Sequence, residues 1–195
     1  MSQGKPLHFW YKVVVLAAVV APVTVSAAMK APPSAASLFK EVRDLETGGA
    51  LLPGSHLWMY GSRMVDYYTI DRANAIALKG AAQGVEHVRR FPAGSLYIKE
   101  NFDDHKVLKT VTAMLKVPGY DTADRNWLMA AYKPDGQVIA YGRVASCISC
   151  HALARTTDFT FPPLTRLPIS TVQAFFPHQA ISPRYRALLA TQKSR

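Results

Sequence analysis

The sequence predicts an α+β fold: an antiparallel β-sheet with a few packed helices, one of which carries both cysteines near the C-terminus. Alternating apolar and polar residues in the middle of the chain are typical of strands, and Pro134-Asp135-Gly136 predicts a tight hairpin. Helical periodicity is found on either side of this region. We therefore expect an antiparallel sheet with helices packed on it.

The first 28 residues have the pattern of a secretory signal peptide. Two lysines and no acid precede an apolar run over residues 13–25, and small residues follow at Ser26-Ala27-Ala28. We expect cleavage after Ala27 or Ala28 and a periplasmic or otherwise exported protein. An uncleaved membrane anchor is the alternative, although the apolar run is shorter than the about 20 residues that a span requires.

The mature chain is predicted to begin with a Pro/Ala linker at residues 29–36, followed by one domain at residues 37–161. A helix should start at Ser37 and end at Gly48-Gly49, because the apolar residues between them recur at helical spacing. The chain has 195 residues, of which 49% are hydrophobic and 18% charged. That length and composition suit a single globular domain with a hydrophobic core.

Strands and short helices follow in the rest of the domain. Asp71 is expected to cap a short helix after the first two strands. In the long central strand, Val107 should share one face with Val111 and Ala113. The predicted ranges are 56–59 and 63–69 for the first strands, 72–82 for the short helix, 95–102, 106–117, 127–132 and 138–141 for the later strands, and 143–154 for the helix with the cysteines.

Residues 162–195 differ in composition from the domain, because they contain five prolines and several aromatic residues. We expect a Pro/aromatic-rich C-terminal arm that wraps around the domain, with a short helix from Pro183. The sequence assigns no function to this arm.

The chain carries a formal net charge of +10, with lysine and arginine spread along its length. Proteins that bind nucleic acid more often concentrate basic residues in one stripe or block, and no nucleic-acid-binding motif accompanies the charge. We therefore expect no nucleic-acid partner. A basic surface either keeps the protein soluble or steers an acidic redox partner towards it.

Cys147-Ile148-Ser149-Cys150-His151 is the C-x-x-C-H pattern to which haem is attached in c-type cytochromes. On a helix the two cysteines lie on one face, where their sulfurs can reach the two vinyl groups along one porphyrin edge. His151 then lies below the ring and can coordinate its iron. The pattern predicts one covalent haem c, bonded to Cys147 and Cys150, with His151 as an axial ligand of the iron.

Three other interpretations of the cysteine pair stay open. Export permits a structural disulfide. A zinc site needs four ligands, whereas the chain holds only one C-x-x-C. A thioredoxin-like redox pair would be expected in an early βαβ unit. The histidine that follows, the export signal and the lack of other cysteines favour haem.

The second axial position of the iron has no clear ligand in the sequence. No methionine follows His151, so a methionine ligand would come from upstream, where each candidate also suits the core. The histidines outside the motif and the signal lie in polar or loop segments. An open sixth position favours small-ligand binding or chemistry over pure electron relay. The upstream candidates are Met59, Met64, Met114 and Met129, and the histidines are His56, His87, His105 and His178.

A β-rich domain that ends in C-x-x-C-H resembles the cytochrome P-460 family and its relative cytochrome c′-beta. The resemblance covers residues 37–161 and excludes the arm. C-x-x-C-H alone is unspecific, but its place after a Pro-x-Gly-x₄-Lys-Glu strand is more specific. The segments that carry the resemblance are Phe91 to Glu100, Pro118 to Asp121 with Asn126-Trp127, Cys147 to His151, and Thr157 to Phe161.

The resemblance assigns roles to two further residues. The family carries a lysine that is bonded covalently to the porphyrin rim, and Lys99 is the matching position, although c′-beta relatives lack this link. Arg63 corresponds to a distal arginine with a catalytic role. From the residues alone, both would be taken for solvated surface charges. A cross-linked Lys99 would lose its ammonium charge and distort the macrocycle.

Members of the family handle small nitrogen compounds. The resemblance implies oxidation or binding of hydroxylamine and nitric oxide at a five-coordinate haem, with electrons passed to a redox partner cytochrome. The alternatives are a nitric-oxide-binding protein of the c′-beta kind without turnover, and a plain electron-transfer cytochrome. Family members are often dimers, and the aromatic residues of the arm could serve a homodimer contact.

Overall fold

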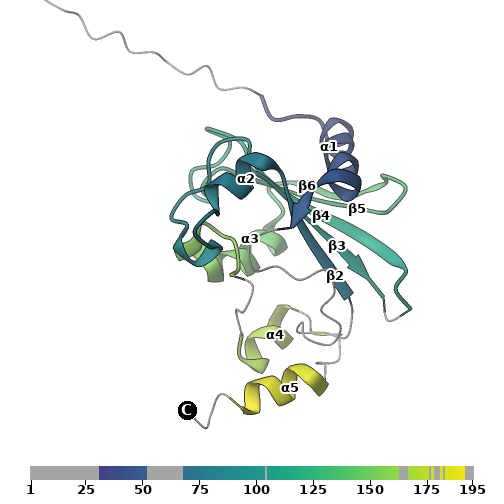
Figure 1. The fold of residues 1–195 in the computed structure, drawn as a ribbon, viewed down its shortest axis with the longest axis vertical. Coiled ribbons are helices and arrows are strands. Elements are labelled where there is room, and N and C mark those ends of the chain that lie inside the picture. Colours follow the sequence, from purple (N-terminus) through teal and green to yellow (C-terminus); the bar gives the residue numbers. More distant parts are fainter. Residues whose placement is uncertain are drawn as a thin grey trace, which may run out of the picture.

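The computed structural model describes residues 31–51, 68–103, 105–162, 167–175, 177, 181 and 183–191. These residues form an α+β domain around one antiparallel sheet in the order β1-β2-β3-β4-β5-β6 (Figure 1). Every strand therefore pairs with its neighbour in the chain. The strands are β1 (Ala50–Leu51), β2 (Tyr68–Ala73), β3 (Leu96–Phe102), β4 (Leu108–Lys116), β5 (Trp127–Tyr132) and β6 (Val138–Gly142).

Helix α1 (Ala35–Gly48) covers one face of this sheet. It begins before the predicted Ser37, because the Ser34 hydroxyl accepts the Ser37 N–H at 3.1 Å and so caps the helix. Leu38 and Val42 are fully buried against the sheet. The Tyr132 hydroxyl on β5 donates to the Ala35 carbonyl at 3.0 Å and ties the start of the helix to the strand.

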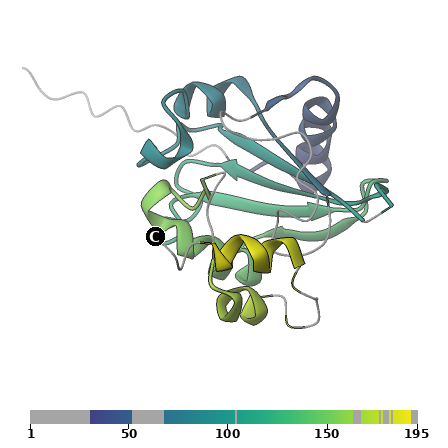
Figure 2. The same cartoon turned by 60° about the horizontal axis from the view of Figure 1, so that its bottom comes forward.

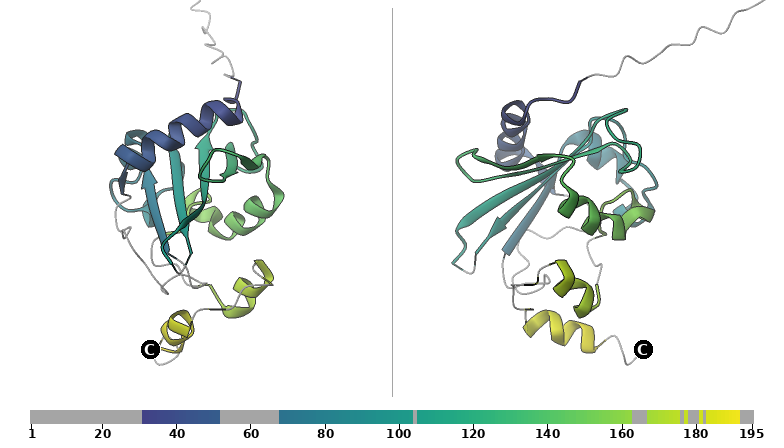
Figure 3. Two further views of the ribbon diagram at one scale, coloured as in Figure 1. Left: turned by 90° about the vertical axis from the view of Figure 1, so that its right-hand side faces the viewer. Right: turned by 180° about the vertical axis from the view of Figure 1, so that it is seen from behind.

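The opposite face of the sheet is covered by the segments that carry the cysteines (Figures 2 and 3). A buried cluster joins Tyr97, Trp127 and Phe159 to the half-buried Cys147. The sheet is thus a layer between α1 and the cysteine helix. The covering elements are α2 (Ala75–Gly80), the 3-10 turn η1 (Val85–His87), α3 (Ala145–His151) and the 3-10 turn η2 (Ala152–Thr157).

The predicted short helix at 72–82, capped by Asp71, is wrong at its start. Strand β2 continues to Ala73, because Asp71 lies opposite Lys99 and Arg72 opposite Ile98 in the β2–β3 ladder. The Arg72 guanidinium also contacts the Glu100 carboxylate at 2.9 Å. Helix α2 begins only at Ala75.

Three other predictions lie outside the described residues. They are the signal peptide, the role of Arg63 and the strand at 56–59.

The hairpin at Pro134-Asp135-Gly136 is confirmed: the Gly136 N–H donates to the Lys133 carbonyl at 2.9 Å.

The prediction that Val107 shares the buried face of Val111 and Ala113 is wrong, since its side chain is 53% exposed. A register shift between Asn101 and Phe102 inserts one residue into β4, and Leu108 packs inward instead.

The described part of the C-terminal arm contains α4 (Ile169–Phe175) and α5 (Pro183–Ala190), which confirms the helix predicted from Pro183. Its buried side chains, Val172, Ile181 and Tyr185, pack on one another. The Tyr185 hydroxyl donates to the Leu167 carbonyl and accepts the Leu167 N–H, both at 2.7 Å.

None of the helices in the described ranges is long and apolar enough to span a membrane.

Asn74 joins α2 to the sheet, and its replacement is expected to destabilise the domain. Its side-chain oxygen accepts the Ala77 N–H at 2.9 Å and the Leu96 N–H at 3.2 Å, while its Nδ2 donates to the Gly94 carbonyl at 2.8 Å. Asn74→Ala should lower the free energy of unfolding by about 2 kcal/mol in urea titrations. Asn74→Asp loses only the donor and should lose about 1 kcal/mol. Equal stability of both variants and wild type would contradict this role.

Candidate functional site

Helix α3 places Cys147, Cys150 and His151 on one side, because residues three and four positions apart lie over one another. Both cysteines carry free, half-buried thiols. Cys147 packs against the buried cluster beneath the helix. The site is therefore built on a helix that is fixed to the sheet rather than on a loop.

The two thiols are protonated at neutral pH. Burial raises the pKa of Cys147, which a hydrogen bond with Ser146 partly opposes. Burial also raises the pKa of Cys150, while the positive charge of Lys99 lowers it. A thioredoxin-like pair needs a thiol whose pKa is lowered, so these surroundings disfavour that alternative. Among the described residues, no group of three or more His, Cys, Asp or Glu side chains is placed so that it could hold a metal ion.

His151 has the orientation and charge state of a metal ligand. Its Nδ1 lies 2.7 Å from the Phe159 carbonyl oxygen, so Nδ1 carries the proton and donates it. Nε2 is then left with a lone pair for a metal ion. Burial lowers the pKa of His151, the hydrogen bond with Phe159 raises it, and the charge of Lys99 lowers it. The net lowering keeps the imidazole neutral at neutral pH.

The carbonyl that orients His151 belongs to a tight turn. Asp158 and Phe159 have φ values of 55° and 67°, the left-handed region that residues other than glycine seldom adopt. Such a conformation persists only where the surroundings determine it. The Asp158 carbonyl accepts the Trp127 Nε1–H at 2.7 Å, and the Thr157 hydroxyl donates to the Thr160 carbonyl at 2.7 Å.

A buried ion pair holds the same turn. The Asp158 carboxylate accepts the Phe91 N–H and a proton of Lys116 Nζ, both at 2.6 Å. The Lys116 and Asp158 side chains are 5% and 0% exposed. Lys116 Nζ also lies 4.5 Å from the centre of the Trp127 ring. Burial lowers the pKa of Lys116, and the contact with Asp158 opposes that effect.

Lys99 lies in a row of partly exposed residues across the sheet beside α3. The strand register places Asp71, Lys99, Thr112, Ala131 and Ala140 opposite one another in turn, so they share one face. Each is partly exposed, whereas the parallel row that contains Tyr97 is buried beneath α3. The strand register puts Lys99 on the face of the sheet that α3 covers, and its positive charge lowers the pKa of both Cys150 and His151.

This face carries small side chains and buried hydroxyl groups that the described residues leave unpaired. Thr112, Ala131 and Ala140 are small residues in the partly exposed part of the sheet. Two buried hydroxyl oxygens of the same face, on Tyr97 and Thr69, have no hydrogen-bond partner among the described residues. Two thiols, a neutral imidazole with its Nε2 available, and a floor of small side chains are the groups that a covalently attached haem requires. The residues present therefore fit the predicted cofactor.

The structure brings together four of the five site residues predicted from the sequence: Cys147, Cys150, His151 and Lys99. Arg63, the fifth, lies outside the described residues, as do Met59, Met64, His56 and His178. Met114 and Met129 are buried in the cluster beneath α3, and His87 and His105 are exposed.

Sequence reasoning missed Asp71, Lys116 and Asp158. The alternation of Thr69, Asp71 and Ala73 could have placed Asp71 on a strand, on the same face as Lys99. Lys116 and Asp158 are 42 residues apart, and no local pattern links them.

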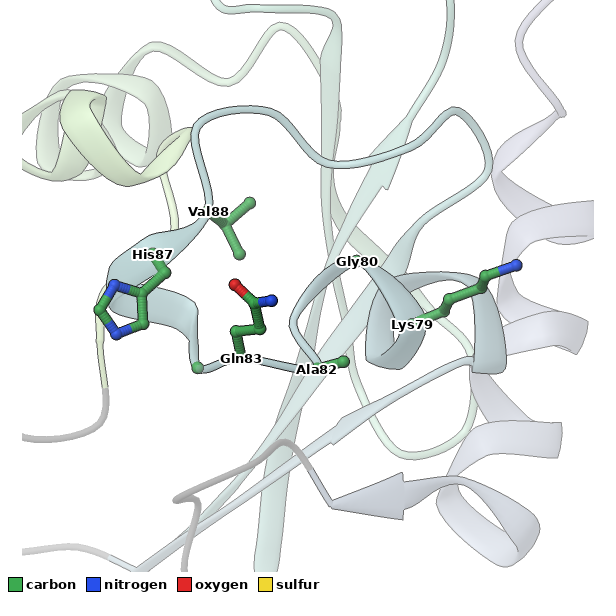
Figure 4. Close-up of a pocket in the computed structure, with 7 residues that line it drawn as sticks. Lys79, Gly80, Ala82, Gln83, His87 and Val88 are labelled. Atoms are coloured by element: carbon green, nitrogen blue, oxygen red, sulfur yellow. The ribbon is translucent and has the colours of Figure 1, made fainter.

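A separate hollow of about 190 Å³ lies between the end of α2 and η1 (Figure 4). Its lining residues come from that connection alone, and none of them belongs to the site on α3. They are Lys79, Gly80, Ala82, Gln83, Gly84, His87 and Val88.

No protein-family model matches this sequence, and no curated protein matches it.

The Lys116–Asp158 pair is expected to show strong coupling. Asp158→Asn leaves the buried Lys116 without its partner, and Lys116→Met leaves Asp158 with Arg125 Nη1, at 3.9 Å, as its remaining cation. Each should lower the free energy of unfolding by about 3 kcal/mol. The double variant removes both charges, so it should lose less than the sum of the two single losses. Urea titrations of the four proteins give the coupling free energy. Additive losses would mean that the two side chains do not act as a pair.

Proposed function

We propose that this chain is an exported mono-haem c-type cytochrome of the cytochrome P-460 kind, which binds or oxidises small nitrogen compounds such as hydroxylamine and nitric oxide. The observation that carries the proposal is the convergence of two helical thiols, a neutral imidazole with an available Nε2, and a lysine from the sheet. In the sequence these groups belong to two segments about 50 residues apart, whose combination carries the resemblance to that family.

Each of these residues would hold the cofactor in a different way. Cys147 and Cys150 would bond it through thioethers, and His151 would ligate its iron through Nε2. Lys99 would bond its rim. Bound haem would supply an iron that coordinates a small nitrogen compound and takes up electrons from it.

The chain itself supplies orientation and a route for protons. The Phe159 carbonyl fixes the His151 ring and makes its Nε2 a better donor. Oxidation of N–H bonds releases protons, which a carboxylate near the reacting atoms can accept. Asp71 lies directly opposite Lys99 in the β2–β3 ladder and is our candidate for this base.

One feature of the sheet favours the nitric-oxide-binding alternative. Asp71 and Thr112 are the direct neighbours of Lys99 in its row. Ala131 and Ala140 follow on the next two strands, where they suit a small apolar ligand better than a polar substrate. Hydroxylamine turnover by the purified holoprotein distinguishes the two functions. An electron-transfer cytochrome would need a second axial ligand instead, and Met114 and Met129 are buried in the core.

The proposal includes the location and the partners of the protein. We place the mature chain in the periplasm or another exported location, since haem is attached to C-x-x-C-H outside the cytoplasm and residues 1–28 have a signal pattern. A redox partner cytochrome would exchange electrons with it, and the aromatic residues of the arm at 162–195 would support a homodimer. The domain at 37–161 would hold the single haem c.

Haem attachment should depend on both cysteines. The full chain, expressed in a host that attaches haem in its periplasm, should be coloured and heavier than the mature polypeptide by one haem. Cys147→Ala and Cys150→Ala should each keep at most one thioether, so the pyridine haemochrome band should shift. The double variant should lose all covalent haem. Ser149→Ala is the control on the same helix and should retain it. A colourless wild-type protein would refute the proposed function.

Lys99 should determine the electronic spectrum of the ferrous protein. With a bond between Lys99 and the porphyrin rim, the Soret band lies to the red of ordinary haem c, and a haem–Lys99 peptide survives denaturation and digestion. Lys99→Ala and Lys99→Arg should both give an ordinary haem c spectrum, because neither supplies a primary amine. Lys109→Ala, on the neighbouring strand, is the control. A wild-type spectrum in Lys99→Ala would rule out the cross-link.

A further inference from the structure

Arginines gather around η2, the turn that follows the C-x-x-C-H helix. Arg89 Nη1 donates to the Thr156 carbonyl at 3.2 Å, and Arg125 Nη1 donates to the Arg89 carbonyl at 3.0 Å. The Arg155 guanidinium lies 5.1 Å from the centre of the Phe159 ring. Residues far apart in the sequence thus bring their positive charges to one turn.

Arg143 extends this cluster to the other end of α3. Its guanidinium contacts the Asp121 carboxylate and lies 3.7 Å from Asp124 Oδ2. Burial and the neighbouring Asp121 raise the pKa of Asp124, while the positive charges of Arg143 and Arg155 lower it. Arg143 precedes α3 and Arg155 lies on η2, so a positive charge stands at each end of the α3–η2 segment.

Most carboxylates of this region lie beneath the surface, whereas three of its arginines lie on it. Asp158 and Asp124 are 0% and 5% exposed, whereas the Arg143 side chain is 63% exposed. Arg89 and Arg155 are also exposed. A partner that approaches this face meets the guanidinium groups first, so its local potential is positive.

Exposed carboxylates of the described residues lie mostly elsewhere. Glu41 and Asp44 are on α1, across the sheet, and Asp135 is in the β5–β6 hairpin. Glu86 on η1 is the exposed carboxylate near the arginines, and it lies 3.8 Å from His87. On the α3–η2 side, the exposed arginines of the described residues therefore outnumber the exposed carboxylates.

Leu153 supplies an apolar contact on the same face. It is 49% exposed on η2, two residues after His151. An apolar contact surrounded by like charges is typical of interfaces in which charges steer the encounter and an apolar centre excludes water. Its place next to the attachment residues brings a partner close to the cofactor.

We infer that the α3–η2 face is the docking surface for an acidic electron-transfer protein, with Leu153 at its centre and Arg89, Arg143 and Arg155 at its rim. The inference rests on the proposed function, because the electron passes to or from the haem held by α3. Each encounter transfers one electron: one cofactor is oxidised by one electron as the other is reduced by one. No bond forms or breaks.

Flavodoxin, a small acidic protein, serves as the probe. Its fully reduced form gives one electron to the ferric holoprotein, and stopped-flow absorbance follows the reaction at about 10 mM ionic strength, where charges act over about 30 Å. Arg155→Glu should lower the second-order rate constant about tenfold. Lys40→Glu makes the same change of net charge on α1, on the other face of the sheet, and should lower it by less than about twofold.

A second variant and a second probe separate docking from misfolding. Leu153→Ser keeps all charges. It should lower the rate constant for reduction by flavodoxin about threefold, without changing the salt dependence of that rate constant. A cationic cobalt(III) phenanthroline oxidant should react faster with ferrous Arg155→Glu than with wild type. An unchanged visible spectrum shows that each variant retains its haem environment.

The outcomes distinguish the inference from the proposed function. Suppose that the protein is coloured and that Arg155→Glu and Lys40→Glu lower the rate constant for reduction by flavodoxin equally. Then only net charge matters, so the docking surface is refuted while the haem assignment stands. If neither variant changes the rate, the surface is also refuted. If the protein carries no haem, the proposed function fails and the inference fails with it.

Discussion

The hydrogen bond between His151 and the Phe159 carbonyl is the contact on which the candidate site depends. It fixes which imidazole nitrogen carries the proton, and so which one is available to a metal ion. The carbonyl points at the ring only because two successive residues adopt left-handed backbone conformations. That turn is held by the buried Asp158, whose side chain and backbone bind Lys116, Phe91 and Trp127.

The sheet makes the rest of the site possible by having two different faces. One face is apolar and is covered by α1. The other is buried beneath α3 and partly exposed beside it, in the row that contains Lys99, Thr112 and Ala131. The turn at Asp158 is anchored to β4 and β5 through Lys116 and Trp127, and Lys99 lies on β3, which pairs with β4, so the histidine and the lysine are positioned by the same sheet.

Much of this architecture could be predicted from local patterns. The apolar spacing of Leu38 and Val42 predicted α1, and the sequence also predicted the helix that carries Cys147, Cys150 and His151. Patterns failed where tertiary contacts decide. Asp71 suits a helix cap as well as a strand, and only its pairing with Lys99 selects the strand. The bulge that turns Val107 outward, and the pairing of Lys116 with Asp158, depend on residues distant in the sequence.

The central claim is that Nε2 of His151 binds an iron atom attached to α3. The most direct test is a crystal of the exported, purified protein measured at the iron absorption edge. The account predicts one strong anomalous peak within bonding distance of His151 Nε2, with continuous density from Cys147 and Cys150 to a planar group. No iron peak, or a peak bound away from His151, would contradict it.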